Sequence, residues 1–426
     1  MIIAAPTACV LTGVFVLLWF KLPTWAPAWV VEHSPWVDPI VRAVNEEEGS
    51  AHLERASELL IARGPAVIPH LIPWVQRNEY WGQKLVGSVF SHLQDDRIVE
   101  PTTVAILEWD EVMYPRHWVD ALCAQDPTTV TDHILPHLVA GSLVRQALLD
   151  VAGRLPGERL IPALTVLMVQ PGTWGTEDSQ GRFRETAEVA AEALVNSPCP
   201  SAVIALVEAY TDGSVAIRRR VLDGIANGDW ADDQTESRKL DQRLQQLLLA
   251  AMDDADQSVR CSAAQIMHLL FVSGADARLL TMSKSTDEVD PRCAIFGLHP
   301  KWHGEAATRR IVEALHDADD RVRLTAISVL RRIDQFCPTS ELLDLLSSPN
   351  AEVRMAACNE LYRNSDRNDP RLFPAFVKLM DDPVLDIFHR AHNAASFVAE
   401  STEMKKIVDE KFRARIMHLN PFGSDE

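Results

Sequence analysis

Three groups of residues in this sequence have side chains that bind metal ions and lie close together along the chain. A structural zinc site needs four such ligands, held at a recognised spacing. None of the three groups supplies four ligands, and in one of them a proline disturbs the helical spacing. We therefore expect no metal site, and a polar helix face or a loop in each case. The groups are Cys293, His299 and His303; Asp386, His389 and His392; and His133 with His137.

The short motifs of the common catalytic and nucleotide-binding sites are also missing. The sequence contains no Gly-x-Ser-x-Gly elbow, no Gly-x4-Gly-Lys phosphate loop, no His-Glu-x-x-His zinc motif and no glycine-rich dinucleotide turn. We therefore expect no catalytic residue, no cofactor and no small-molecule substrate. Residues from distant parts of the chain could still assemble a catalytic group, so an enzyme stays the alternative.

The elements that would position such residues follow from a repeat. The stretch DADDRVRLTAISVLRRI combines an acidic turn, a Val-Arg pair and an apolar helical face, and the same pattern returns before and after it. Aligned basic residues are Arg260, Arg292, Arg323 and Arg354, which gives steps of 32, 31 and 31 residues. Self-similarity at such a period predicts a solenoid of stacked helix pairs, in which no pair is stable alone.

Acidic residues recur six positions before the aligned basic residue. An aspartate at a turn can accept hydrogen bonds from the first backbone N–H groups of the next helix. We expect the aspartate and arginine side chains to form a ladder along the stack. Ser348 replaces the acid before Arg354. The predicted ladder consists of Asp178, Arg184, Asp212, Arg218, Asp254, Arg260, Asp317, Arg323 and Arg354.

The pattern resembles HEAT repeats, especially the short repeats of proteins related to phycobilisome lyases. Proline in the first helix, aspartate at the turn and Val-Arg at the start of the second helix are the signature, and Val259-Arg260, Val322-Arg323 and Val353-Arg354 match it. The resemblance covers residues 51–400. It implies an all-α, right-handed solenoid of about nine to ten helix pairs. It also implies an alternative function, the attachment of a bilin chromophore to a protein.

Tryptophan is the side chain most informative about binding, with eleven in the chain against four tyrosines. Three of them lie in polar loops: Trp174, Trp230 and Trp302. Exposed tryptophan in polar surroundings is typical of protein interfaces, so we expect these three to contact a partner. In the repeat, Trp230 and Trp302 fall on the same edge. The alternative is that each ring folds down over a junction between repeats.

The N-terminus predicts a membrane anchor. Residues 2–20 carry no charged side chain, and a helix of that length can cross a hydrocarbon core of about 30 Å. We predict a transmembrane helix over residues 1–21. A cleaved secretory signal is the alternative, with Ala26-Pro27-Ala28 as its cleavage site. The lack of basic residues before the apolar run and the length of that run favour the anchor.

The segments around the repeats complete the predicted organisation. Residues 22–50 contain four prolines and predict a Pro/Trp-rich linker. Residues 51–400 form the solenoid, and residues 401–426 form a capping helix and tail, for which a membrane-surface helix is the alternative. Lys21 and Arg42 follow the apolar run, which favours a cytoplasmic position for the body of the protein.

Charge and cysteine content limit the function further. The chain has 41 basic and 60 acidic residues and a net charge of −19, which argues against binding to a nucleic-acid backbone. The cysteines are odd in number and scattered singly, which favours buried free thiols in a reducing compartment. We therefore predict a membrane-anchored scaffold that docks a protein partner, most simply a membrane-associated complex. The cysteines are Cys9, Cys123, Cys199, Cys261, Cys293, Cys337 and Cys358.

Overall fold

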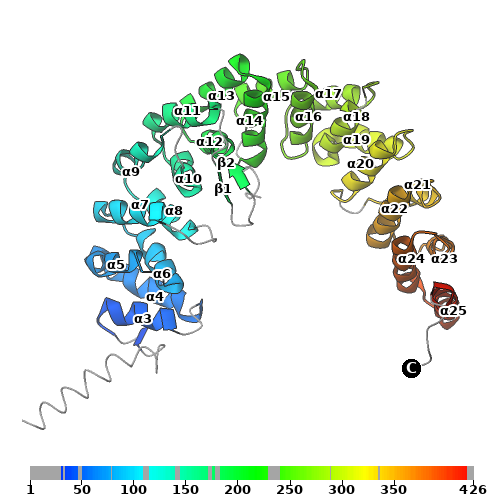
Figure 1. Ribbon diagram of the computed structural model, residues 1–426, viewed down its shortest axis with the longest axis horizontal. Coiled ribbons are helices and arrows are strands. Elements are labelled where there is room, and N and C mark those ends of the chain that lie inside the picture. Colours follow the sequence, from blue (N-terminus) through cyan, green and yellow to red (C-terminus); the bar gives the residue numbers. More distant parts are fainter. Residues whose placement is uncertain are drawn as a thin grey trace, which may run out of the picture. The chain divides into compact units, whose positions relative to one another are not determined.

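The computed structural model describes most of the chain as helices (Figure 1). The chain divides into two compact units, unit 1 (Met1–Asp229) and unit 2 (Trp230–Glu426). Apart from one two-stranded ribbon, the regular structure of the described residues is helical. The described residues are 30–31, 34–46, 50–77, 79–108, 115–139, 144–170, 175–177, 183–228, 240–287, 289–333 and 336–419.

Unit 1 is built from successive pairs of short helices. Its helices are α3 (Val37–Glu46), α4 (Ser50–Ala62), α5 (Ile68–Val75), α6 (Tyr80–Phe90), α7 (Val99–Glu108), α8 (Arg116–Cys123), α9 (Pro127–Ile134), α10 (Gln146–Arg154), α11 (Ile161–Val169), α12 (Thr186–Asn196), α13 (Pro200–Asp212) and α14 (Val215–Asn227). Four 3-10 turns begin or end helices: η1 (Gly64–Val67), η2 (Asp96–Ile98), η3 (Leu135–His137) and η4 (Glu158–Leu160).

Unit 2 repeats the same arrangement. Its helices are α15 (Gln242–Ala251), α16 (Gln257–Ile266), α17 (Ala275–Met282), α18 (Asp290–Gly297), α19 (Pro300–Ala314), α20 (Asp320–Leu330), α21 (Thr339–Leu345), α22 (Ala351–Asn364), α23 (Leu372–Leu379), α24 (Leu385–Val398) and α25 (Thr402–Leu419). From α3 to α24 the described residues therefore make eleven pairs, more than the nine to ten expected. The predicted right-handed path of the stack stays a prediction.

Within each unit the helices form two layers. The even-numbered helices, here called B helices, pack against one another in series, and each odd-numbered A helix packs on the B helix of its own pair. In α20, for example, Val322, Ala326, Ile327, Val329 and Leu330 are buried on the face that meets the neighbouring helices. Burial of such faces in the junctions stabilises the stack, because an isolated helix pair would leave them in water.

Small residues let neighbouring B helices approach closely. A Cβ atom on Gly153 of α10 would lie 2.8 Å from Cα of Ala193 in α12, and one on Gly224 of α14 would lie 2.8 Å from the carbonyl carbon of Ala191. Contacts of that length cannot be made without moving a helix backbone. The close spacing of the B layer in unit 1 thus depends on glycine at these positions.

The predicted linker 22–50 is partly wrong, because its second half forms helix α3. Val37, Ile40, Val41 and Val44 are buried, and the helix packs on α4 and α6. Pro39 does not prevent this helix, since it lies in the first turn, where its missing N–H would have no intrahelical partner. The apolar spacing of these residues was the signal that the proline count concealed.

The predicted anchor, residues 1–21, lies outside the described residues. Among the residues that are described, none of the helices combines the length and the apolar character needed to cross a bilayer. The C-terminal capping helix corresponds to α25, which packs on α24 and buries Val408.

A short antiparallel ribbon takes the place of one predicted loop in unit 1. Strand β1 (Gly175–Glu177) pairs with β2 (Phe183–Glu185), with Thr176 opposite Arg184. Arg184 was expected at the start of a second helix, but it lies in β2, and α12 begins at Thr186. The expectation for Arg184 as a ladder residue in a helix is therefore wrong, because the strand pairing ends only at Glu185.

Candidate functional site

The arginines at the start of the B helices bind the preceding turn through its main chain. In three repeats of the described part of unit 2, Nη1 of the arginine donates to the carbonyl oxygens of the residues six and five positions earlier. These hydrogen bonds join Arg260 to Asp254 (3.0 Å) and Ala255 (3.2 Å), Arg323 to Asp317 (2.6 Å) and Ala318 (3.3 Å), and Arg354 to Ser348 (2.8 Å) and Pro349 (3.1 Å). The guanidinium group thereby satisfies two carbonyl groups of the turn between the A and B helices, beyond the last residue of the A helix.

The acid at the turn has a different task from the one expected. The Asp254 carboxylate accepts from the N–H of Asp256 at 2.8 Å, and Asp256 in turn caps α16 by accepting from Ser258 N–H at 2.9 Å. In the repeat that lacks the acid, Ser348 Oγ accepts a hydrogen bond from Asn350 N–H at 3.3 Å. The turn needs an acceptor, which serine also provides. This explains why Arg354 keeps its contacts without an aspartate six residues earlier.

Carboxylates of the following repeat complete the ladder. Arg260 donates to both oxygens of Asp290 at 3.3 Å, and Arg354 donates to both oxygens of Asp382 at 2.6 and 3.0 Å. Arg323 instead pairs with Asp320 of its own helix. These contacts tie the turn edge of one repeat to the next. The contribution of the ladder to the stability of the stack stays a prediction.

Asp382 illustrates the electrostatics of these contacts. Its side chain is 4% exposed and that of Arg354 is 12% exposed. Burial would raise the pKa of Asp382, but hydrogen bonds from Arg354 and the Val384 N–H and the charges of Arg354 and Arg415 outweigh it, so that the pKa lies below its ordinary value. The carboxylate is therefore held in its charged form, as a bidentate pair with arginine requires.

The remaining ladder residues lie in unit 1. Arg218 of α14 donates to the carbonyl oxygen of Gly213 at 3.1 Å, and Asp212 is exposed at the end of α13. Asp178 lies outside the described residues. Arg220, which was not predicted, makes the longer connection, since it donates to the carbonyls of Met168 (3.1 Å) and Gln170 (3.2 Å). The ladder is thus less regular in this unit.

A disulfide bond joins Cys261 of α16 to Cys293 of α18, with 5.1 Å between their Cα atoms. The expectation of free thiols was wrong for this pair. Each cysteine directly follows an aligned basic residue, Arg260 or Arg292, so the two lie at the same place on adjacent B helices. This register was visible in the sequence. The expected reducing compartment loses its support, because disulfides persist mainly in oxidising ones.

Trp302 lies at the start of α19, where one repeat joins the next. Its ring is half-buried, and its indole N–H donates to the carbonyl oxygen of His268 at 3.2 Å. The Lys301 ammonium group lies 4.4 Å from the centre of the ring, and the Phe271 ring lies 6.3 Å away, centre to centre. Phe271 is 60% exposed and Leu269 is 44% exposed. Trp174 and Trp230 lie outside the described residues.

A second aromatic ring continues this surface along the same edge. The His268 ring packs edge-on against Phe296 of α18 at 5.0 Å, and the Arg332 guanidinium lies 3.9 Å above the Phe296 ring. Arg332 also donates to the carbonyl oxygen of Phe296 at 3.1 Å. Phe271, Phe296, Lys301, Trp302 and Arg332 are called the aromatic–cationic patch below. Sequence reasoning found only Trp302, because the others come from three different repeats.

Comparison with known families identifies the repeat. Residues 308–396, from α19 to α24, match the family model for HEAT repeats. This part of the chain is similar to HEAT repeats. One solved structure, an engineered protein from a structural genomics consortium, is 16% identical, covers 86% of this chain and 99% of its own, and has a TM-score of 0.31, too low to indicate a shared fold. A search of curated proteins found no match.

The side chains of the three candidate metal-binding groups contact other parts of the fold. Cys293 is in the disulfide, and the His303 Nδ1 accepts from the His299 N–H at 3.0 Å. The His392 ring lies 4.2 Å from the Phe412 ring of α25, where the last repeat is capped. His133 bonds its own helix at the Thr129 carbonyl. Among the described residues, no three metal-binding side chains cluster.

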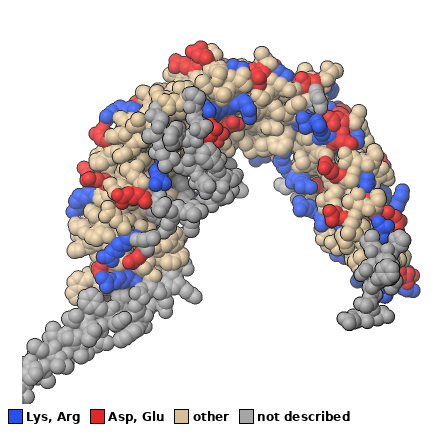
Figure 2. All heavy atoms as spheres, viewed as in Figure 1, with Lys and Arg blue, Asp and Glu red and all other residues tan. Residues whose placement is uncertain are grey.

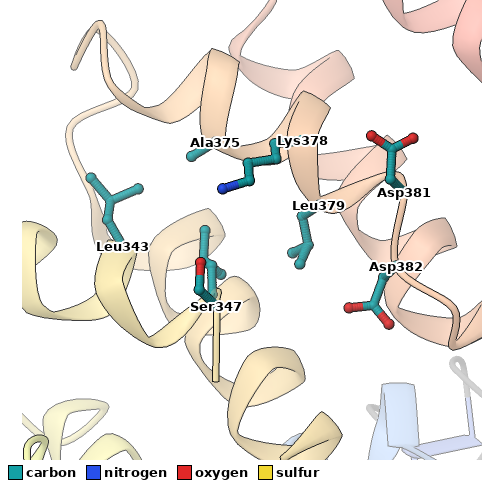
Figure 3. A pocket seen from close by; sticks show the side chains of 8 residues that line it. Leu343, Ser347, Ala375, Lys378, Leu379, Asp381 and Asp382 are labelled. Atoms are coloured by element: carbon teal, nitrogen blue, oxygen red, sulfur yellow. The ribbon is translucent and has the colours of Figure 1, made fainter. Parts of the chain in front are cut away.

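A groove of about 420 Å³ lies between the A helices α21 and α23 of the last HEAT repeats. Figure 3 shows Leu343 and Ser347 on one side and Ala375 and Leu379 on the other, with the Lys378 side chain extending into the space between them. Asp381 at the rim accepts a hydrogen bond from Lys411 of α25 at 2.6 Å. The groove offers no pair of converging catalytic groups.

A second hollow lies at a turn edge of unit 1 and is lined by polar side chains. Its polar groups already serve the fold, since Asp126 caps α9 through Thr129 N–H at 2.8 Å and Gln125 donates to the carbonyls of Phe90 and Leu93, both at 3.0 Å. It is therefore a turn junction at the surface in which Gln125 and Asp126 are already bonded to the main chain.

Proposed function

We propose that this protein is a non-enzymatic scaffold that docks a partner protein on unit 2, at the edge where the C-terminal ends of its B helices lie. The aromatic–cationic patch is the observation that carries the proposal. Phe271 is an aromatic ring exposed to 60% beside a half-buried tryptophan, and such anchors supply most of the energy of protein interfaces. Stacked repeats hold the patch on rigid helix ends.

The surface charge fits a protein partner better than a nucleic acid. Figure 2 shows acidic and basic side chains interspersed over the visible face of each unit, without a continuous basic field on that face. Binding to a phosphate backbone rests on such a field. The net charge of −19 also argues against a nucleic-acid partner.

The apolar segment 2–20 adds the second part of the proposal, in which the scaffold is tethered to a membrane and its partner belongs to a membrane-associated complex. Tethering raises the local concentration of the scaffold at the bilayer without new contacts. Membrane fractions should retain the protein after alkaline carbonate extraction. Release of the full chain without detergent would contradict the anchor.

Two features of the protein favour opposite sides of the membrane for its helical body. Lys21 and Arg42 favour a cytoplasmic body, whereas the Cys261–Cys293 disulfide favours an oxidising compartment. Alkylation of thiols in intact cells, before and after reduction, measures which prediction holds. Immediate labelling of Cys261 without reductant would support the cytoplasmic position.

The lyase alternative has no specific observation in its favour. It requires a chromophore-sized pocket with an available acid or cysteine. The groove between α21 and α23 has no cysteine in its lining, and both of its acids are paired, Asp381 with Lys411 and Asp382 with Arg354. Visible absorbance of the purified protein would support the lyase and contradict the scaffold.

The docking proposal is tested by site-specific crosslinking of the full chain, extracted in mild detergent. A photo-reactive side chain at position 271 should crosslink one defined protein, and the same group at position 284 should not. Lys284 is exposed near the end of α17, at the opposite turn edge of the repeats. Trp302→Ala should abolish the crosslink. An identical product from both positions would contradict docking on the patch.

A further inference from the structure

The cations of the aromatic–cationic patch differ in their partners from several other arginines of unit 2, which pair with carboxylates. Arg331 pairs with Glu360, Arg354 with Asp382 and Arg371 with Asp369. By contrast, no carboxylate of the described residues forms an ion pair with Lys301 or Arg332. Their printed contacts are with ring faces and, for Arg332, one carbonyl oxygen.

The rings hold these two cations at the surface rather than neutralising them. A cation above an aromatic face is attracted by the ring quadrupole, yet its N–H groups still need acceptors. Lys301 is exposed and Arg332 is half-buried beside Phe296. An acceptor that approached from solvent would therefore meet two positive groups, with the rings of Phe271 and Trp302 beside them.

The His268 ring, which packs on Phe296, lies close enough to Arg332 to be affected by its charge. Burial lowers the pKa of His268, and the charges of Arg332 and His299 lower it further, although the hydrogen bond to the Gln265 carbonyl opposes them. The nearby acid Asp276 acts on His303 instead, and Glu305 is exposed beyond the kink of α19 at Gly304, which separates it from Trp302. The charges that reach His268 are thus cationic.

We propose that the patch binds an extended segment of the partner protein in which an aspartate or glutamate stands next to an apolar or aromatic residue. This inference rests on the docking function proposed above and adds the chemistry of the partner. The carboxylate would accept from Lys301 and Arg332, and the apolar side chain would cover Phe271 and Leu269. Exclusion of water by that side chain strengthens the ion pairs, so the two contacts support each other.

The test uses the full chain in detergent and short fluorescent peptides that alternate glutamate with phenylalanine. Fluorescence anisotropy should show saturable binding that weakens as salt is raised. A peptide with lysine in place of each glutamate, and one with alanine in place of each phenylalanine, should bind about tenfold more weakly or not at all. Equal binding of the glutamate and lysine peptides would overturn the proposal.

Variants locate the binding on the protein. Lys301→Glu with Arg332→Glu should lower the affinity for the acidic peptide by about tenfold or more and should restore binding of the lysine peptide. Lys284→Glu, a charge reversal at the opposite edge, should change neither. Because Arg332 is half-buried and its loss could disturb the fold, Phe271→Ser serves as a second variant, which alters only an exposed ring.

The outcomes separate this inference from the docking proposal. If position 271 crosslinks a defined partner but acidic peptides bind no better than basic ones, docking holds and the acidic chemistry is wrong. If Phe271→Ser and the double reversal leave acidic-peptide binding unchanged, the peptide binds elsewhere and the inference fails. Loss of binding in both variants, with the helical circular dichroism signal retained, supports it.

Discussion

Units 1 and 2 stack the same kind of helix pair but connect their repeats differently. B helices approach through glycine in both units, at Gly153 and Gly224 in unit 1 and at Gly297 in unit 2. In the described part of unit 1 a single residue, Gln125, also donates to the carbonyls of Phe90, Leu93 and Ala121. In unit 2 Arg260 and Arg354 reach carboxylates of the next repeat, whereas Arg323 pairs within its own helix, and a disulfide is added. The contact that recurs in all three repeats is the one from the arginine to the preceding turn.

This difference shows which features make a repeat recognisable. A periodic polar contact places the same residue type at the same position in each unit, and the match to HEAT repeats accordingly falls in unit 2, at residues 308–396. Apolar packing accepts many residues of similar size, so unit 1 can stack equally well with a weaker pattern. Polar ladders therefore make the repeat recognisable in the sequence. Burial of apolar faces stabilises the stack within each unit.

The largest effect is expected from breaking the ladder in unit 2. Arg354→Met should lower the free energy of unfolding by about 3 kcal/mol, because it leaves the Asp382 carboxylate buried without its cation. Urea unfolding, followed with hydrogen exchange of α22 to α24, measures the loss. Arg363→Met, on the exposed end of α22, is the control and should cost little.

The same variant should show a distinctive pH dependence. Without Arg354, burial raises the pKa of Asp382 above its unfolded value, so the folded form gains stability as pH falls toward 4. The wild-type protein behaves in the opposite way, because its lowered pKa makes this contribution disappear as pH falls below the unfolded value of 3.8. The deficit of the variant should shrink on acidification. A constant deficit would mean that Asp382 is not buried as described.

Removal of the disulfide should have the next largest effect, also confined to unit 2. Reduction of Cys261–Cys293 should cost about 3 kcal/mol, since the bond closes a loop of one repeat in the unfolded chain. Cys261→Ser with Cys293→Ser should show the same loss and no further response to reductant. Unchanged hydrogen exchange in α16 and α18 after reduction would show that the bond does not stabilise this junction.

In unit 1 the matching experiment is to separate two B helices. Gly224→Val should cost about 2 kcal/mol, because the added side chain meets the backbone of α12 at Ala191. Ala226→Val, two positions along the same helix and half-exposed, is the control. Thermal unfolding monitored by circular dichroism compares the two. Equal midpoints would contradict the close approach of α12 and α14.

The smallest expected effect concerns acid sensitivity. Burial, with a smaller contribution from the charge of Lys84, lowers the pKa of His117 to about 4, against 6.5 in the unfolded chain. Protonation therefore favours unfolding, and stability present above pH 6.5 is lost as pH falls toward 4, by roughly 1 kcal/mol at about pH 5.5. Hydrogen exchange should show α6 and α8 of unit 1 loosening.

The comparison with unit 2 sharpens that prediction. The pKa values of His268 and His303 are lowered as well, so unit 2 should also lose stability, but less. His117→Gln should flatten the response of unit 1 and leave that of unit 2 unchanged. An equal response of both units in the wild-type protein would show that His117 is not the group responsible.

Local patterns were sufficient for much of the architecture. The Val-Arg register placed α16, α20 and α22 correctly, and the apolar spacing in α20 matches the buried face. The same method failed at Arg184, because strand pairing over β1 and β2 depends on two segments at once. It failed at Val37–Glu46 because proline content outweighed a helical spacing that was present.

By itself the sequence determined the repeat, its approximate period and the position of the arginines, since these depend on residues within one helix pair. Only the tertiary structure decided which carboxylates of the next repeat Arg260 and Arg354 bind, that Cys261 and Cys293 are joined, and that Phe271, Trp302, Phe296 and Arg332 share one surface. The reason is physical. These contacts join residues about one repeat apart, and their geometry is set by how closely neighbouring helices pack.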